Sequence, residues 1–121
     1  MHTPEQRLFS RIQFHHGARI VIAGRQIACE VIDLSLKGAL LNTAAPLDIP
    51  AGTECALELV LDDGLSVVRM EGQVAHCESS RFGLVCQSID IDSITHLRRL
   101  LELNLGDAEL LEREFAALQH D

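Results

Sequence analysis

The feature that most constrains the fold is a series of six short apolar segments, rich in β-branched residues and separated from one another by turn signals. The segments cover residues 19–23, 27–32, 39–42, 54–61, 66–76 and 82–89. From Glu54 to Leu61 apolar and polar side chains alternate, which is typical of a strand with one buried face. Asp62-Asp63-Gly64 follows, and these residue types tolerate the positive φ angles of a tight hairpin turn. Six strands at this spacing predict an antiparallel barrel or sandwich.

Beyond Ile91 the apolar period becomes helical. Asp92 or Ser93 is suited to cap the start of this helix, and Gly106 to end it, because glycine readily adopts the left-handed conformation found after helix ends. The apolar positions that share one helical face are Ile94, Leu97, Leu100, Leu101 and Leu105. A second helical stretch is predicted from Asp107 to Leu118. We expect this tail to pack on the strands, with leucines left over for a partner or a second copy.

Length and composition predict a single domain. A chain of 121 residues, 47% of them hydrophobic, is near the commonest domain size and can bury one core. It has no Trp or Tyr and only four Phe, so the core must consist of Val, Ile, Leu, Ala and Cys. The four cysteines form no CxxC pair and lie in apolar stretches, which favours packing as small hydrophobes over a zinc or redox role. With no signal peptide or transmembrane segment visible, we expect a reducing, cytoplasmic location.

The charge of the chain limits its partners. A formal net charge of −8 argues against nucleic acid and anionic membranes, because sequence-independent binding to either needs a basic face. The scarcity of aromatic residues also disfavours a site for single-stranded nucleic acid. Residues 1–25 contain four arginines and one glutamate, whereas residues 101–121 contain six acids and one arginine. We therefore expect a small anionic ligand to be drawn to the amino end.

Two short motifs carry groups that can hold a guanine nucleotide. The first is Arg7-xxx-Arg11, in a polar stretch, residues 1–13, that we expect to be a flexible arm preceding the domain at residues 14–121. The second is Asp33-Leu34-Ser35-Leu36-Lys37-Gly38, a turn sequence between two apolar runs. Guanidinium groups match phosphate oxygens and the O6/N7 edge of guanine, while a carboxylate accepts from N1 and N2 at the opposite edge. Together the motifs predict one divided binding site.

In this order, Arg7-xxx-Arg11 and Asp33-x-Ser35-xx-Gly38 resemble the signature of the PilZ domain, a bacterial receptor for cyclic di-GMP. The likeness continues to the carboxyl end, where the segments at residues 96–100 and 103–107 are similar to stand-alone PilZ proteins of pseudomonads. The resemblance implies a mainly β fold, a six-stranded antiparallel β-barrel of the split-barrel type with a C-terminal helical tail. It also implies no catalytic activity and no cofactor, with cyclic di-GMP as the ligand held between the arm and the barrel surface.

The resemblance assigns a role to each residue of the two motifs. Arg7 and Arg11 are expected to bind the phosphates and the Hoogsteen edge of guanine. Asp33 and Ser35 are expected to bond a guanine edge, and Gly38 to let the backbone turn tightly beside the ligand. Ligand binding is then expected to order the arm against the barrel, and so to change a surface that an unidentified downstream protein reads.

Four further positions are weaker ligand-binding candidates. In the family an arginine just before the first motif arginine favours a bound pair of ligands, but this chain has Gln6 there, which leaves the number of ligands open. Leu8 occupies a place where close relatives carry another arginine. His76 stands where an aromatic side chain would stack on a base, and Lys37 is at most a secondary phosphate contact.

The alternatives differ in class. Arginines four residues apart are often only a solvated pair, and Asp33-Leu34-Ser35 alone is most often a simple turn. A PilZ-fold module that contacts a partner protein without nucleotide is therefore the alternative function, and a monomer or weak dimer is expected in either case. An enzyme is not expected, because no catalytic triad or pair of carboxylates stands at catalytic spacing. Nor do we expect metal at His15-His16, because adjacent strand residues point to opposite faces.

Overall fold

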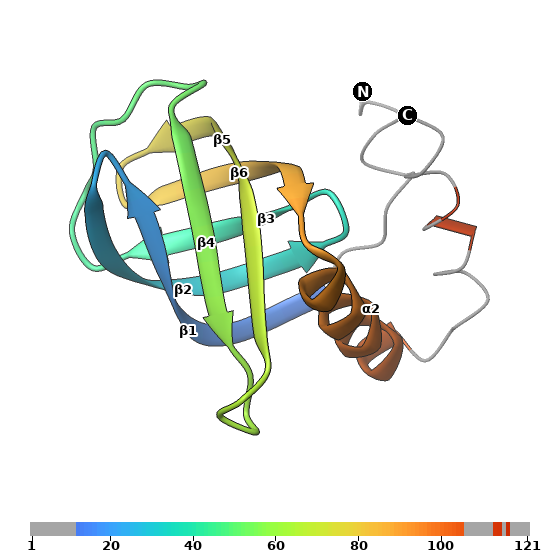
Figure 1. Ribbon diagram of the computed structural model, residues 1–121. Helices are drawn as coiled ribbons and strands as arrows, with labels where there is room; N and C mark the ends of the chain where they lie inside the picture. Colours follow the sequence, from blue (N-terminus) through green and yellow to red (C-terminus); the bar gives the residue numbers. More distant parts are fainter. Residues whose placement is uncertain (1–11, 106–112, 115, 117–121) are drawn as a thin grey trace.

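The protein is a closed six-stranded barrel with a helix at one end. The computed structural model describes residues 12–105, 113, 114 and 116. Its elements are β1 (Ile12–Ile22), β2 (Arg25–Ser35), β3 (Gly38–Thr43), β4 (Glu54–Val60), β5 (Val67–Glu78), β6 (Arg81–Ile89) and α2 (Ile91–Leu105). The strands pair in the order β1-β2-β3-β6-β5-β4, every pair antiparallel, and β4 closes on β1 (Figure 1). The barrel, rather than the sandwich, is therefore the observed fold.

The first strand is longer than its apolar pattern indicated. It begins at Ile12, so the last two residues of the expected arm, residues 12 and 13, belong to the strand, and the remainder of the arm lies outside the described residues. His15, His16 and Gly17 interrupt the apolar run here, and the pairing with β2 shifts register between Gln13 and His16. A polar, bulged strand has no clean period of two, which is why the apolar pattern placed its start at residue 19.

The core of the barrel is aliphatic, as the composition required. Among the largest fully buried side chains in the described part of the chain, only Phe82 is aromatic. Cys29 and Cys55 are buried in this core, and burial raises the pKa of each thiol to about 11. Both thiols therefore stay protonated at neutral pH and pack as small hydrophobes.

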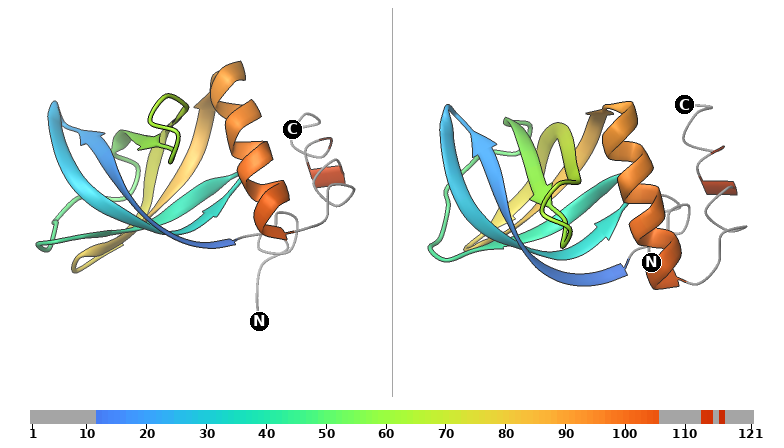
Figure 2. Two further views of the ribbon diagram at one scale, coloured as in Figure 1. Left: turned by 90° about the horizontal axis from the view of Figure 1, so that it is seen from below. Right: turned by 60° about the horizontal axis from the view of Figure 1, so that its bottom comes forward.

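Helix α2 lies against one end of the barrel (Figures 1 and 2). Leu97 and Leu101 are fully buried in the core cluster, and the helix contacts β5 and β1. Asp90, one residue before the helix, is its cap, because its Oδ2 accepts from the Ser93 N–H at 2.9 Å. The expected caps, Asp92 and Ser93, were therefore wrong. The expected stop at Gly106 and most of the second helical stretch lie outside the described residues.

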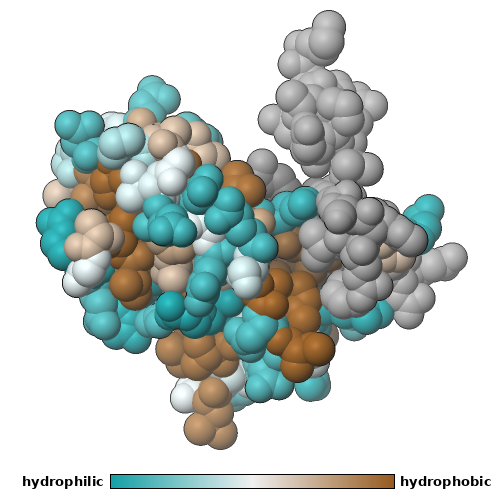
Figure 3. Space-filling view, turned by 45° about the horizontal axis from the view of Figure 1, so that its top comes forward, coloured by the Kyte–Doolittle hydropathy of each residue, from teal (hydrophilic) through white to brown (hydrophobic). Residues whose placement is uncertain are grey.

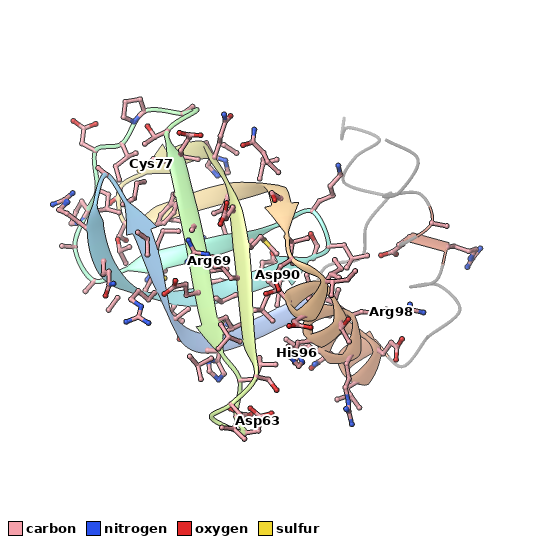
Figure 4. The ribbon with its side chains drawn as sticks, viewed as in Figure 1. Asp63, Arg69, Cys77, Asp90, His96 and Arg98 are labelled. Carbon is pink, nitrogen blue, oxygen red and sulfur yellow. The ribbon has the colours of Figure 1, made fainter. Side chains whose placement is uncertain are left out.

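Ser93 joins the helix start to β5. Its Oγ accepts from the Arg69 backbone N–H at 2.9 Å and donates to Asp90 Oδ1 at 2.7 Å, where Asp90 lies between β6 and α2 (Figure 4). The hydrogen bonds from Ser93 are also the main cause of a lowered pKa at Asp90. The buried serine thus links the strand, the cap and the helix through one hydroxyl.

Ser93→Ala is expected to lower the free energy of unfolding by about 1–3 kcal/mol, because it leaves a strand N–H without its acceptor. Urea denaturation followed by circular dichroism measures this change. The control is Ser88→Ala, which removes an exposed hydroxyl and should stay within about 0.5 kcal/mol of the wild type. Equal stabilities for the two variants would contradict the linking role of Ser93.

The surface combines hydrophilic and apolar areas. In the face seen in Figure 3, brown apolar areas are separated by hydrophilic side chains. Within the described ranges, the most exposed large apolar side chains are Leu65, Ile91 and Leu103, with 87%, 79% and 76% of their area accessible. None of the helices in the described part of the chain is long and apolar enough to span a lipid bilayer.

Candidate functional site

The turn between β2 and β3 is held by the side chain of Ser35. Its Oγ accepts from the Lys37 N–H at 3.2 Å and lies 3.4 Å from the Gly38 carbonyl oxygen, to which it can donate. The Lys37 carbonyl in turn accepts from the Cys86 N–H at 2.7 Å, which ties the turn to β6. Ser35 is buried, so its hydroxyl supports the turn, and a contact between this hydroxyl and a ligand stays a prediction.

The packing of the strands explains why position 38 is a glycine. Its φ is not positive, so the turn does not need the conformational freedom of glycine at this position. Instead, a Cβ at Gly38 would lie 2.0 Å from the backbone oxygen of Leu84 and 3.4 Å from the Cα of Val85. Glycine is therefore required by the close approach of β3 to β6, whereas the expected reason was a tight turn beside a ligand.

The register of the strands places Asp33 and His76 in one row across the barrel wall. Asp33 pairs with Leu40, Leu40 with Gly83, and Gly83 with His76. At about 4.8 Å per strand, the two ends of this row are about 14 Å apart. The row therefore runs across β2, β3, β6 and β5.

A second row runs beside the first, toward the turn. Ser35 pairs with Gly38, Gly38 with Val85, and Val85 with Gln73. The residues between the two rows are Leu34, Ala39, Leu84 and Val74, and all four are buried in the core. Because successive strand residues point to opposite faces, both rows lie on the outside of the barrel.

These two rows define the outer face, which is the candidate functional site. It brings together Asp33 and Ser35 of β2, Gly38 of β3 and His76 of β5, with Lys37 in the turn at its edge. Asp33 is half-buried and His76 is exposed. The other candidates, Gln6, Arg7, Leu8 and Arg11, lie outside the described residues.

Gly83 is a residue of this face that the sequence analysis missed. A Cβ at this position would lie 2.8 Å from Cε1 of the His76 imidazole, so the ring lies directly over the Gly83 backbone. A lone glycine in an apolar strand often indicates that another group approaches the backbone closely. Gly83 could have been identified from the sequence on this basis. Leu40 and Val85 complete the apolar part of the face, and Val85 is 47% exposed.

The arginines on the opposite side of the barrel are engaged with acids. Arg19 Nε donates to Glu58 Oε1 at 3.2 Å, and Arg69, on β5 in Figure 4, pairs with the same carboxylate and with Glu71. Arg19 was one of the four arginines that made the amino end basic. Since Glu58 balances it, the attraction for an anion depends on the remaining arginines.

The histidine pair is divided between two acidic neighbours. His16 Nε2 lies 3.0 Å from Asp62 Oδ1, whereas His15 Nδ1 lies 4.0 Å from Glu30 Oε1. The pKa of His16 is raised, first by the hydrogen bond to the Gly17 carbonyl and then by Asp62. Within the described residues, no three side chains of His, Cys, Asp or Glu lie close enough together to hold a metal ion.

The chain is similar to one known protein family and to solved structures of that fold. A family model described as the PilZ domain matches residues 5–103. The crystal structure of the PilZ domain of CeSA from a cellulose-synthesizing bacterium matches with a TM-score of 0.61 and 17% identity, over 80% of this chain and 96% of that domain. The Bacillus subtilis inhibitor of motility, MotI/DgrA, matches with a TM-score of 0.68 and 17% identity, over 88% of this chain and 57% of its own. At such identities the two structures support the fold alone.

Proposed function

This chain belongs to the PilZ domain family, and we propose that it is a receptor for cyclic di-GMP that binds the nucleotide on the outer face. PilZ domains are a family of cyclic di-GMP-binding modules. The observation that carries the proposal is the clustering of Asp33, Ser35, Gly38 and His76 on one face, although they come from three different strands. Such clustering is expected of a binding site and is not required by the turn chemistry of residues 33–38.

The roles follow from the chemistry of the ligand. Asp33 accepts hydrogen bonds from N1 and N2 of a guanine, and the imidazole of His76 stacks on a base. Arg7 and Arg11 reach the phosphates and the O6/N7 edge from the arm. The four free cysteines agree with a reducing compartment, so we place this receptor in the cytoplasm.

Signalling is proposed to depend on ordering of the arm. Fixing a residue costs about 1–2 kcal/mol of backbone entropy, and each charge-assisted hydrogen bond returns about 1.5–3 kcal/mol. Several such bonds must therefore form together before the arm is held. Loss of one arginine is then expected to weaken binding by more than its own hydrogen bonds contribute. A downstream protein would read the changed surface, and no catalytic step is needed.

Arg7→Ala and Arg11→Ala are each expected to weaken cyclic di-GMP binding at least tenfold, a loss of about 1.4 kcal/mol or more. Isothermal titration calorimetry of the wild type and both variants measures affinity and the number of ligands per chain. Arg25→Ala is the matched control, because Arg25 is exposed at the other end of β2 from Asp33. If both variants bind as tightly as Arg25→Ala, the assigned role of the arm is wrong.

The second candidate function is a partner-binding module that does not use nucleotide. It is favoured by the exposed Leu65, Ile91 and Leu103 and by the likeness in fold to an inhibitor of motility. The same titration separates the two functions. A wild-type protein that gives neither heat nor amide shifts with micromolar cyclic di-GMP would support the second candidate.

A further inference from the structure

We infer that a cavity at the β5–β6 hairpin is a base subsite of the nucleotide site, in which Arg81 binds the Hoogsteen edge of a guanine and Glu78 its Watson–Crick edge. This inference rests on the proposed function. The cavity measures about 350 Å³, within the range of about 300–1,000 Å³ that is usual for small-molecule sites. Its lining consists of Asn42, His76, Glu78, Ser79, Ser80 and Arg81.

The cavity is continuous with the outer face. It shares His76, which ends the row that begins at Asp33. Its own residues form the next row outward, because Asn42 pairs with Arg81 and Arg81 pairs with Glu78 across the hairpin. Neighbouring rows on one side of a strand are about 7 Å apart. A ligand that contacts Asp33 can therefore extend along the face into this cavity.

The hairpin is fixed in place on β3. Ser80 Oγ donates to Asn42 Oδ1 at 3.2 Å, and the Ser80 carbonyl accepts from the Thr43 N–H at 2.7 Å and from Thr43 Oγ1 at 3.1 Å. The turn itself holds Ser79 at a φ of 59°, in the left-handed region. The walls of the cavity are thus set by strand pairing and hydrogen bonds before any ligand arrives.

Arg81 and Glu78 differ from the charged pairs elsewhere on the barrel. Arg19 and Arg69 on the barrel strands each pair with a glutamate, as does Arg98 on helix α2. Arg81 and Glu78 face each other across the hairpin, yet neither forms an ion pair or a hydrogen bond through its side chain within the described part of the chain. Both charged groups line the cavity and are exposed, so they are available to a ligand.

The two groups match guanine and mismatch adenine. A guanidinium donates to O6 and N7 of guanine, and a carboxylate accepts from its N1–H and N2–H groups. Adenine has a donor at N6 in place of the O6 acceptor, and it offers an acceptor at N1. The pair therefore selects guanine by favourable bonds on both edges and rejects adenine by unfavourable contacts.

The first test follows backbone amide shifts of the full chain during titration with cyclic di-GMP. We expect shifts at Ser79 and Ser80 in the hairpin as well as at Lys37 and Gly38 in the turn. Shifts confined to the turn would overturn the subsite and leave the proposed function standing. Amides that move in neither place would overturn both.

The second test measures specificity by calorimetry with cyclic di-GMP and cyclic di-AMP. Arg81→Ala is expected to weaken cyclic di-GMP binding about tenfold, and Glu78→Gln to reduce the preference for cyclic di-GMP over cyclic di-AMP about tenfold, as for loss of one bidentate base contact. Arg25→Ala again serves as the control. Affinities and preferences equal to those of Arg25→Ala would overturn the assignment even if the hairpin amides shift.

Discussion

Gly38→Ala is expected to lower the free energy of unfolding by about 3 kcal/mol or more, at the upper end of the cost of overpacking. The added Cβ would meet the Leu84 carbonyl oxygen at 2.0 Å. That oxygen belongs to the backbone of β6, so it cannot turn away as the end of a flexible side chain can. Relief requires β3 to separate from β6, its neighbour in the barrel. Urea denaturation followed by circular dichroism measures the loss.

Gly17→Ala is the matched control for this substitution. A Cβ at Gly17 would meet no atom within 4 Å, and its φ is not positive. Its stability should therefore stay within about 0.5 kcal/mol of the wild type. If the two variants are equally stable, the close approach of β3 to β6 is not what demands glycine at position 38.

This result bears on how the second motif is interpreted. The glycine of Asp33-x-Ser35-xx-Gly38 and the hydroxyl of its serine both have structural partners inside the protein. A variant at either position can lose nucleotide binding because the turn is distorted.

Local chemistry made the strands and turns predictable from sequence. Asp62-Asp63-Gly64 predicted a hairpin, and in the structure Asp63 Oδ1 accepts from the Leu65 and Ser66 amides at 2.9 and 2.7 Å, with Gly64 at a φ of 72°. These groups act on neighbours within three residues, so a short stretch of sequence is sufficient. The helix start was harder to predict, because the cap is Asp90 and the hydroxyl of Ser93, one of the two expected caps, accepts from the backbone of β5, far away in sequence.

The outer face was only partly predictable, because it depends on register. The motif residues Asp33 and Ser35 were found through local turn chemistry, and His76 through family resemblance. Gly83 and Arg81 join them only because β6 lies between β3 and β5, an order that no local pattern encodes. A shift of one residue in the β3–β6 or the β5–β6 pairing would move the outward-facing residues of the shifted strand to the core side.

Asp33→Asn is expected to weaken cyclic di-GMP binding about a hundredfold or more. The carboxylate is proposed to accept two hydrogen bonds from the N1 and N2 hydrogens of guanine, each contributing about 1.5–3 kcal/mol when the acceptor is charged. Asparagine removes the charge and places an NH₂ donor opposite one of those hydrogens. The two effects together exceed the loss of about 2.7 kcal/mol that a hundredfold change represents.

Calorimetry of Asp33→Asn and of the control Asp48→Asn, an exposed loop residue, measures this difference. Urea denaturation of both variants establishes that binding is compared between folded proteins. An affinity within threefold of the control would contradict the contact between Asp33 and guanine.

Cyclic di-AMP adds a comparison within the same variant, because adenine has an acceptor rather than a donor at N1. Asp33→Asn should therefore lose far less affinity for cyclic di-AMP than for cyclic di-GMP, a pattern that a general distortion of the turn would not produce.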